Sequence, residues 1–249
     1  MAWAGGIAYL AAIMHTPSLK QYAVVVAGGS GSRMQATQPK QFLPIAGQPV
    51  LMHTLRKFQA YDPGMQLVVV LPEAEISTWQ ELCARHQFTL PHQVVAGGNS
   101  RFQSVKNGLA ALAEEEDGLV AVHDGVRPFI DNDILTSAYA TAAQSGAAVV
   151  AVSLKDSIRQ VRGGTSKAVD RSAYRLVQTP QCFRLPLLRK AYAQPEIPLF
   201  TDDASVVERF GHKIVLVEGS FRNIKLTTPE DLILAEAFLL QEASGKGQD

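Results

Sequence analysis

The chain has 249 residues, with 23 basic and 23 acidic side chains, a net charge of zero and 47% hydrophobic residues. This length and apolar content suit one α/β domain, and the balanced charge argues against a general nucleic-acid or membrane-surface binder, whose affinity depends on a basic excess. The two cysteines, Cys83 and Cys182, belong to no CxxC pair or His-Cys cluster, so we expect neither a disulfide framework nor a structural zinc site, and a reducing cytoplasm is the default location.

Residues 1–20 are apolar and rich in Ala and Gly, but they lack a basic start and are too short to span a bilayer. We expect them to form an N-terminal extension outside the fold, followed by one domain over residues 21–249. A weak signal-like segment is the alternative. Met14 lies seven residues before Gln21 and is a second candidate start of translation.

Residues 22–26 form a short apolar run, which is typical of a strand buried on both faces. A glycine-rich loop follows directly. Glycine permits positive φ and lets backbone N–H groups approach a ligand closely, so such a loop suits phosphate. The loop glycines are Gly28, Gly29 and Gly31.

Two cations accompany this loop, Arg33 and, directly after a proline, Lys40. A dinucleotide fingerprint needs glycine where Met34 stands, and a P-loop needs a closing Gly-Lys-Ser/Thr that is missing here. A tight strand-to-helix turn with solvated charges is the alternative to a phosphate site.

Strands and helices alternate after the loop. Helices are predicted over residues 47–61, 76–86, 102–112 and from 131 or 132 onward, and strands over residues 66–71, 93–96, 119–122 and 147–154. This alternation predicts an α/β fold in which helices cover both faces of a mostly parallel sheet.

The alternation of strands and helices stops over residues 156–177, where short strands are predicted on either side of Gly163 and Gly164. We predict a projecting hairpin here, which we call the arm. Helices over 186–194 and 202–210 and a strand over 213–217 come next. A last helix is predicted to begin at Pro229.

Marked polar segments lie where four predicted strands end. In a parallel sheet, ligands bind at the carboxyl ends of the strands, so we expect these segments to meet. They are residues 28–40, 97–101, 123–128 and 223–225.

Together the motifs resemble the 2-C-methyl-D-erythritol 4-phosphate cytidylyltransferases of the non-mevalonate isoprenoid route. The GG-x-G-x-RM loop is common to many sugar-phosphate nucleotidyltransferases, whereas HD-x-x-RP with TPQ and NIK-x-T is specific. The matching segments are AGGSGSRM, PKQFLPIAGQPVL, GGNSRFQSVKNGL, HDGVRP, VDR, QTPQ, TDDAS and NIKLTTPEDL, spread over about residues 22–239.

The resemblance implies a Rossmann-like sheet with helices on both faces and a β-arm used for dimerisation. It also implies that a cytidylyl group passes from CTP to methylerythritol phosphate, with Mg²⁺ as cofactor and pyrophosphate as the second product. The enzyme would be a cytoplasmic homodimer whose arms complete neighbouring active sites, with no nucleic-acid or membrane partner.

Four cations resemble the family's catalytic residues. Arg33 and Lys40 resemble the pair that stabilises charge at the α-phosphate, and Arg171 and Lys225 the pair that holds the methylerythritol phosphate. Arg171 lies in the arm, which in the family reaches the other subunit. Solvated loop charges and a salt bridge on the surface of the hairpin are the respective alternatives.

The remaining site residues are also carried over by resemblance. The CTP-binding set comprises Ala27, Gly28, Gly29, Gly31, Arg33, Lys40, Gly98, Asn99, Arg101, Ser104 and Gly125. The substrate-binding set comprises Asp124, Ser157, Arg171, Thr179 and Lys225. Asp124 is also the candidate Mg²⁺ ligand, with capping of the following turn as the alternative, and His123 is expected to be a structural imidazole.

Two positions depart from the family. Arg222 stands where relatives more often carry an acid, which puts one hydroxyl contact in doubt and would add phosphate affinity, and Ser157 replaces a frequent threonine. Another polyol phosphate, such as ribitol 5-phosphate, is an alternative substrate, because only a few side chains select the alcohol. A catalytically silent homologue is the other alternative, although such a protein should have lost one of the four cations.

Overall fold

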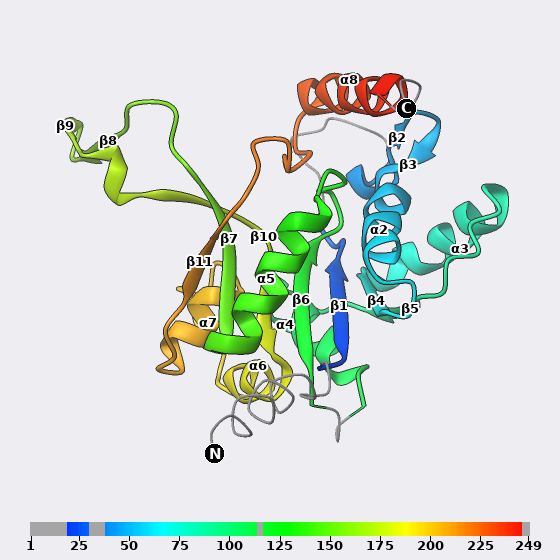
Figure 1. Ribbon diagram of the computed structural model, residues 1–249, viewed down its shortest axis with the longest axis horizontal. Helices are drawn as coiled ribbons and strands as arrows, with labels where there is room; N and C mark the ends of the chain where they lie inside the picture. Colours follow the sequence, from blue (N-terminus) through cyan, green and yellow to red (C-terminus); the bar gives the residue numbers. More distant parts are fainter. Residues whose placement is uncertain (1–18, 30–37, 114–116, 246–249) are drawn as a thin grey trace, which may run out of the picture.

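The computed structural model describes residues 19–29, 38–113 and 117–245. Its centre is a sheet of seven strands in the order β11-β7-β10-β6-β1-β4-β5 (Figure 1). The strands are β1 (Gln21–Val26), β4 (Gln66–Leu71), β5 (Gln93–Ala96), β6 (Leu119–Asp124), β7 (Ala147–Ser153), β10 (Arg175–Arg184) and β11 (Val215–Glu218).

The predicted mostly parallel sheet is confirmed. β1 pairs in parallel with β4 on one side and β6 on the other, so the strands that precede the glycine loop and Asp124 end side by side. β10 is antiparallel to both β6 and β7. The sequence did not predict this strand, because Pro180 and polar neighbours argue against a central strand; its pairing register with β7 shifts between Val177 and Gln181.

Helices cover both faces of the sheet (Figure 1). Successive residues of β1 point to opposite faces, so Val24 and Val25 belong to different apolar clusters. One cluster holds α2 (Val50–Tyr61), α3 (Ile76–Arg85) and α5 (Asn132–Ser145); the other holds α4 (Arg101–Ala110), α6 (Leu185–Tyr192) and α7 (Asp203–Arg209).

The helix expected from residue 47 begins three residues later. Pro44–Ile45 (β2) and Gln48–Pro49 (β3) pair as a small hairpin, whose turn places Ala46 at φ 46° and Gly47 at φ 75°. Left-handed backbone at these positions ends any helix there, so α2 starts at Val50.

The last helix, α8 (Pro229–Gly245), begins where predicted and lies across the end of the sheet that carries the strand carboxyl ends (Figure 1). It packs through Ala235 and Phe238 onto Ile45 and Phe129. No helix in the described ranges is long and apolar enough to cross a membrane.

The predicted hairpin is present in the arm. β8 (Arg159–Arg162) and β9 (Thr165–Ala168) pair antiparallel around Gly163 and Gly164, which adopt φ 50° and 79°. Every residue of these two strands is exposed, and the arm extends away from the sheet (Figure 1).

Candidate active site

A cavity of about 300 Å³ opens at the carboxyl ends of β1 and β6, beside the turn that precedes α4. We call it the glycine-loop lobe. Its lining residues are Val26, Ala27, Gly28, Gly29, Lys40, Gln41, Gly98, Asn99, Ser100, Arg101, Ser104, Asp124, Val126 and Lys225.

A second cavity of about 340 Å³ lies beside the first, and we call it the β10 lobe. Its further lining residues are Arg127, Val177, Gln178, Thr179, Gln181, Thr201 and Asp202. Both lobes share Arg101, Asp124 and Lys225. The site therefore has two compartments with a charged wall between them.

Asp124, the last residue of β6, is the acid of this wall. Its Oδ2 lies 3.0 Å from Nζ of Lys225 and 3.2 Å from Nε of Arg127. Burial would raise the pKa of this carboxyl, but the charges of Lys225, Arg127 and Arg101 outweigh that effect and hold the pKa well below its usual range. Asp124 is therefore ionised, and it orders two cations at the wall.

Backbone and amide bonds bring the Lys225 segment to Asp124. Nη1 of Arg127 donates to the carbonyl of Asn223 at 2.8 Å, and the Asn223 amide donates to the carbonyl of Thr179 at 2.8 Å. The Thr179 hydroxyl in turn accepts from the backbone N–H of Asp124 at 3.0 Å. Segments from β6, β10 and the loop before α8 thus form one hydrogen-bonded unit.

His123 has the structural role expected from the sequence. It is fully buried, its Nε2 lies 3.0 Å from the carbonyl oxygen of Arg127, and its ring packs edge-on against Phe58. Burial lowers the pKa of His123 to about 4, despite its hydrogen bond to Arg127. The imidazole is accordingly neutral at pH 7.

Arg101, at the start of α4, is fixed from behind by a buried acid. Its Nη1 and Nη2 donate to the two carboxylate oxygens of Asp203 at 3.0 and 2.6 Å. Burial works to lower the pKa of Arg101, but the Asp203 charge and hydrogen bonds raise it above its ordinary value. The guanidinium keeps its charge at the wall between the lobes.

The turn before α4 requires glycine. A Cβ on Gly98 would lie 2.1 Å from Cγ of Gln103. The backbone N–H of Gly98 donates to Oγ of Ser104 at 3.1 Å, and that hydroxyl donates to the carbonyl of Ser100 at 2.8 Å. Ser104 therefore shapes the turn on which Gly98 and Asn99 line the lobe.

The glycine loop is exposed at Gly28 and Gly29, and the Lys40 side chain lies against it. A Cβ on Gly29 would lie 3.0 Å from Cε of Lys40. Gly125 packs behind the loop, where a Cβ would lie 2.8 Å from that of Ala27. Gly125 thus supports the lobe without lining it.

The structure brings together most of the predicted site residues. Those that line a lobe are Ala27, Gly28, Gly29, Lys40, Gly98, Asn99, Arg101, Ser104, Asp124, Thr179 and Lys225. Gly31 and Arg33 lie outside the described residues.

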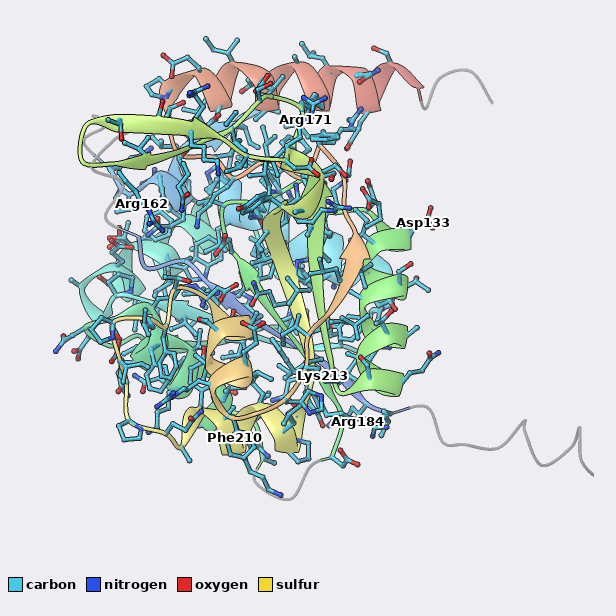
Figure 2. All side chains as sticks on the ribbon, turned by 90° about the vertical axis from the view of Figure 1, so that its left-hand side faces the viewer. Asp133, Arg162, Arg171, Arg184, Phe210 and Lys213 are labelled. Carbon is cyan, nitrogen blue, oxygen red and sulfur yellow. The ribbon has the colours of Figure 1, made fainter. Side chains whose placement is uncertain are left out.

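Two predicted substrate ligands are not in either lobe of the described chain. Ser157 and Arg171 are exposed in the arm, and Nη1 of Arg171 donates to the carbonyl of Lys155. Figure 2 shows Arg171 at the α8 end of the molecule, far from Arg184 at the other end of β10. Within the described chain, neither residue lines the glycine-loop lobe or the β10 lobe.

Arg222 contacts the C-terminal helix α8 in the described chain. Its Nη1 donates to Oε1 of Gln241 at 2.8 Å, and its guanidinium lies 4.7 Å from the ring centre of Phe238. It lines neither lobe of the described chain, so these contacts give no support to phosphate binding by Arg222. Its role is to hold α8 to the loop that carries Lys225.

Several site residues were not identified from the sequence. They stand within the recognised motifs, but each acts through a partner distant in the chain, which no local pattern reveals. They are Gln41, Arg127, Gln178, Gln181, Asp202, Asp203 and Asn223.

The site can hold a divalent cation if one protein carboxylate binds it together with substrate phosphates and water. The described residues hold no cluster of three or more His, Cys, Asp or Glu that could cage a metal. Mg²⁺ in nucleotide enzymes is held by one or two carboxylates together with substrate phosphates and water. Asp124, ionised at the lobe wall, suits that arrangement.

Comparisons with known proteins agree with this architecture. The family model for 2-C-methyl-D-erythritol 4-phosphate cytidylyltransferase (IspD) matches residues 21–241. A protein of that name from Bacteroides thetaiotaomicron is 48% identical over 221 residues, covering 89% of this chain and 100% of the relative. One from Porphyromonas gingivalis is 49% identical over 222 residues, covering 88% of this chain and 98% of the relative.

Solved structures agree as well. 4-Diphosphocytidyl-2C-methyl-D-erythritol synthase from Anaerococcus prevotii superimposes with a TM-score of 0.75 at 26% identity, covering 89% of this chain and 99% of the other. The cytidylyltransferase from Thermus thermophilus gives a TM-score of 0.69 at 32% identity, covering 89% and 98%. This chain therefore belongs to the 2-C-methyl-D-erythritol 4-phosphate cytidylyltransferase family.

Proposed function

We propose that this protein transfers the cytidylyl group of CTP to 2-C-methyl-D-erythritol 4-phosphate, giving 4-diphosphocytidyl-2-C-methyl-D-erythritol and pyrophosphate. The observation that carries the proposal is the pair of lobes that share Arg101, Asp124 and Lys225. Two anionic substrates can occupy adjacent compartments and meet at a wall that supplies positive charge to both.

The reaction needs this charge because the nucleophile and its target are both anionic. A phosphate oxygen of the acceptor attacks the α-phosphorus of CTP, a new P–O bond forms, and the bond to the β-phosphate oxygen breaks with its electron pair leaving on pyrophosphate. Fixed cations and in-line positioning are the main sources of rate enhancement in such transfers.

In the glycine-loop lobe, backbone N–H groups of Gly28 and Gly29 would hold the β- and γ-phosphates. Lys40, which lies against Gly29, would stabilise the charge that develops at the α-phosphate, together with Arg33. The cytosine and ribose would bind at the turn formed by Gly98, where Asn99, Arg101 and Ser104 would also contact them. Ala27 and Gly125 would shape the floor of the lobe. Bound Mg²⁺ would neutralise triphosphate charge, with Asp124 as its protein ligand.

In the β10 lobe, Lys225 and Arg127 would bind the acceptor phosphate and point one oxygen at the α-phosphorus. The Thr179 hydroxyl and the Asp124 carboxylate, which stand on the same wall, would bind further polar groups of the acceptor. Ribitol 5-phosphate offers the same phosphate on a different alcohol, so substrate choice depends on these few contacts.

The acceptor site would be completed by the arm of a second subunit, which contributes Arg171 and Ser157. This accounts for two site residues that are exposed in the described chain. It also accounts for large apolar side chains in and beside the arm that are exposed, Val161 by 70%, Leu176 by 53% and Phe221 by 45%. Burial of such side chains against another subunit favours association, so we propose a homodimer.

One domain would span residues 21–249, preceded by an N-terminal extension over residues 1–20 without a catalytic role. Cys83 and Cys182 form no disulfide, consistent with a reducing cytoplasm.

The test is turnover by the purified full chain with CTP, Mg²⁺ and methylerythritol phosphate, followed by pyrophosphate release and product mass. Parallel reactions replace the acceptor with ribitol 5-phosphate, or CTP with ATP. We expect product only with CTP and the highest kcat/KM with methylerythritol phosphate. A higher value with ribitol phosphate would change the acceptor, and no turnover with either would favour a silent homologue.

A further inference from the structure

We propose that Asp203 is a positioning residue for this reaction, which acts on the substrates only through Arg101. The proposal rests on the proposed function and deepens it, because it assigns the group that fixes the guanidinium shared by both lobes. Asp203 lines neither lobe, so it does not touch the substrates itself.

The first observation is the geometry of the pair. Asp203 is fully buried and accepts one bond from each terminal nitrogen of Arg101, at 3.0 and 2.6 Å. Such a two-point contact fixes the plane of a guanidinium as well as its position. An arginine has five N–H donors, so three remain for other acceptors.

The second observation is that Asp203 itself is held on several sides. The Tyr192 hydroxyl donates to its Oδ1, and Asp203 is the first residue of α7. The neighbouring Asp202 accepts from the Gln181 side chain at 2.9 Å, and that side chain accepts from the backbone N–H of Ala204 at 2.8 Å. The start of α7 is thereby bound to the central strand β10.

The consequence is a rigid link between the two compartments. Asp202 and Gln181 line the β10 lobe and Arg101 lines both lobes, while Asp203 joins Arg101 to the start of α7. A small tilt of the guanidinium would misplace its remaining donors for both substrates. The link joins residues 102 positions apart in the chain.

Asp203→Asn is the test variant, because an amide is nearly isosteric but offers a donor where one Arg101 nitrogen needs an acceptor. We expect kcat/KM for CTP to fall about 10- to 100-fold, the size of a lost hydrogen bond to a charged group. The matched control is Asp117→Asn, since Asp117 pairs with Arg184 at 3.9 Å on the exposed surface and should keep wild-type kinetics.

The deciding comparison repeats the substitution in an Arg101→Ala background. If Asp203 acts only through Arg101, the second change adds less than about twofold to the kcat/KM loss, and the coupling in the double-mutant cycle equals nearly the whole effect of Asp203→Asn. An equal further loss in the Arg101→Ala background would show that Asp203 acts independently of Arg101. Wild-type kinetics of Asp203→Asn alone would show that Asp203 has no positioning role. Either result overturns the proposal.

Two further measurements keep the outcome clear. If Asp203→Asn fails to fold, Asp203→Glu takes its place, because a displaced carboxylate should lower kcat/KM for CTP in the wild type but not in the Arg101→Ala background. The dissociation constant of Mg²⁺–CTP is measured directly by calorimetry. That value reports on Arg101 without turnover, so absence of activity in the wild type would count against the proposed function alone.

Discussion

The Nζ atom of Lys225 lies 3.0 Å from Oδ2 of Asp124, on the wall that the two lobes share. The contact joins the end of a central strand to the loop before the C-terminal helix, about a hundred residues later in the chain. A carboxylate and an ammonium group that are distant in sequence thus form an ion pair where the acceptor phosphate would bind.

Lys225→Ala should lower kcat/KM for methylerythritol phosphate about 100-fold, because one fixed cation is lost while Arg127 still pairs with Asp124. The dissociation constant of Mg²⁺–CTP should change far less. Lys57→Ala is the matched control, since Lys57 pairs with Glu242 at 3.4 Å away from both lobes. Equal losses for both substrates would contradict the assignment to the acceptor.

Lys40→Ala should lower kcat about 100- to 1000-fold with little change in melting temperature, as when one preorganised electrostatic donor is removed. Gly29→Ala should have a smaller effect of the same kind, because its Cβ would lie 3.0 Å from Cε of Lys40 and displace it. Steady-state kinetics with both substrates measure this. A raised KM with unchanged kcat would make Lys40 a ground-state binder.

Folding stability should fall between pH 7.5 and pH 5 because of His123. Its pKa is lowered to about 4 by burial, while the unfolded chain keeps an ordinary value of about 6.5. Below about pH 6.5 the unfolded state binds the proton more readily than the folded state. The free energy of unfolding is therefore lower by about 2 kcal/mol at pH 5. Above about pH 7 the contribution is complete.

Urea unfolding at several pH values tests this. His123→Gln should flatten the pH dependence relative to the wild type. The same slope in the variant and the wild type would contradict the argument.

Arg222→Ala should lower the melting temperature without changing KM for methylerythritol phosphate. The arginine contacts Gln241 and Phe238 of α8, and a half-exposed contact of this kind is worth up to about 1 kcal/mol. Arg222→Lys should retain part of it. A several-fold rise in KM with an unchanged melting temperature would restore the phosphate-binding interpretation.

A mixture of two inactive homodimers tests the shared site. Arg33→Ala and Arg171→Ala dimers should each be nearly inactive, and after subunit exchange roughly half of the dimers are heterodimers. In each heterodimer one site carries both lesions and the other carries neither. About a quarter of all sites should then be intact.

No recovery after verified exchange would show that Arg171 acts within its own chain, because every site would then carry one lesion. Exchange is verified independently with two affinity tags. Asp117→Asn mixed with Arg171→Ala serves as a reference for the activity of a dimer with one intact subunit.

The sequence by itself determined the elements whose signals are local. The apolar runs at β1, β4 and β6 predicted buried strands, and the glycine loop and Asp124 at their ends predicted a ligand site at one edge of the sheet. These signals are read within a few residues, because strand burial and glycine backbone freedom depend on the local chain. The family motifs then supplied the chemistry.

Only the tertiary structure decided which of these residues act together. β10 contains Pro180 and polar side chains, and it becomes a central strand only because β6 and β7 pair with it on both sides. The Arg101–Asp203 pair likewise joins residues 102 positions apart. Such contacts depend on nonlocal strand pairing and on the free-energy cost of burying an unpaired charge. Neither can be predicted from a single segment of the sequence, because each involves residues that are far apart in the chain.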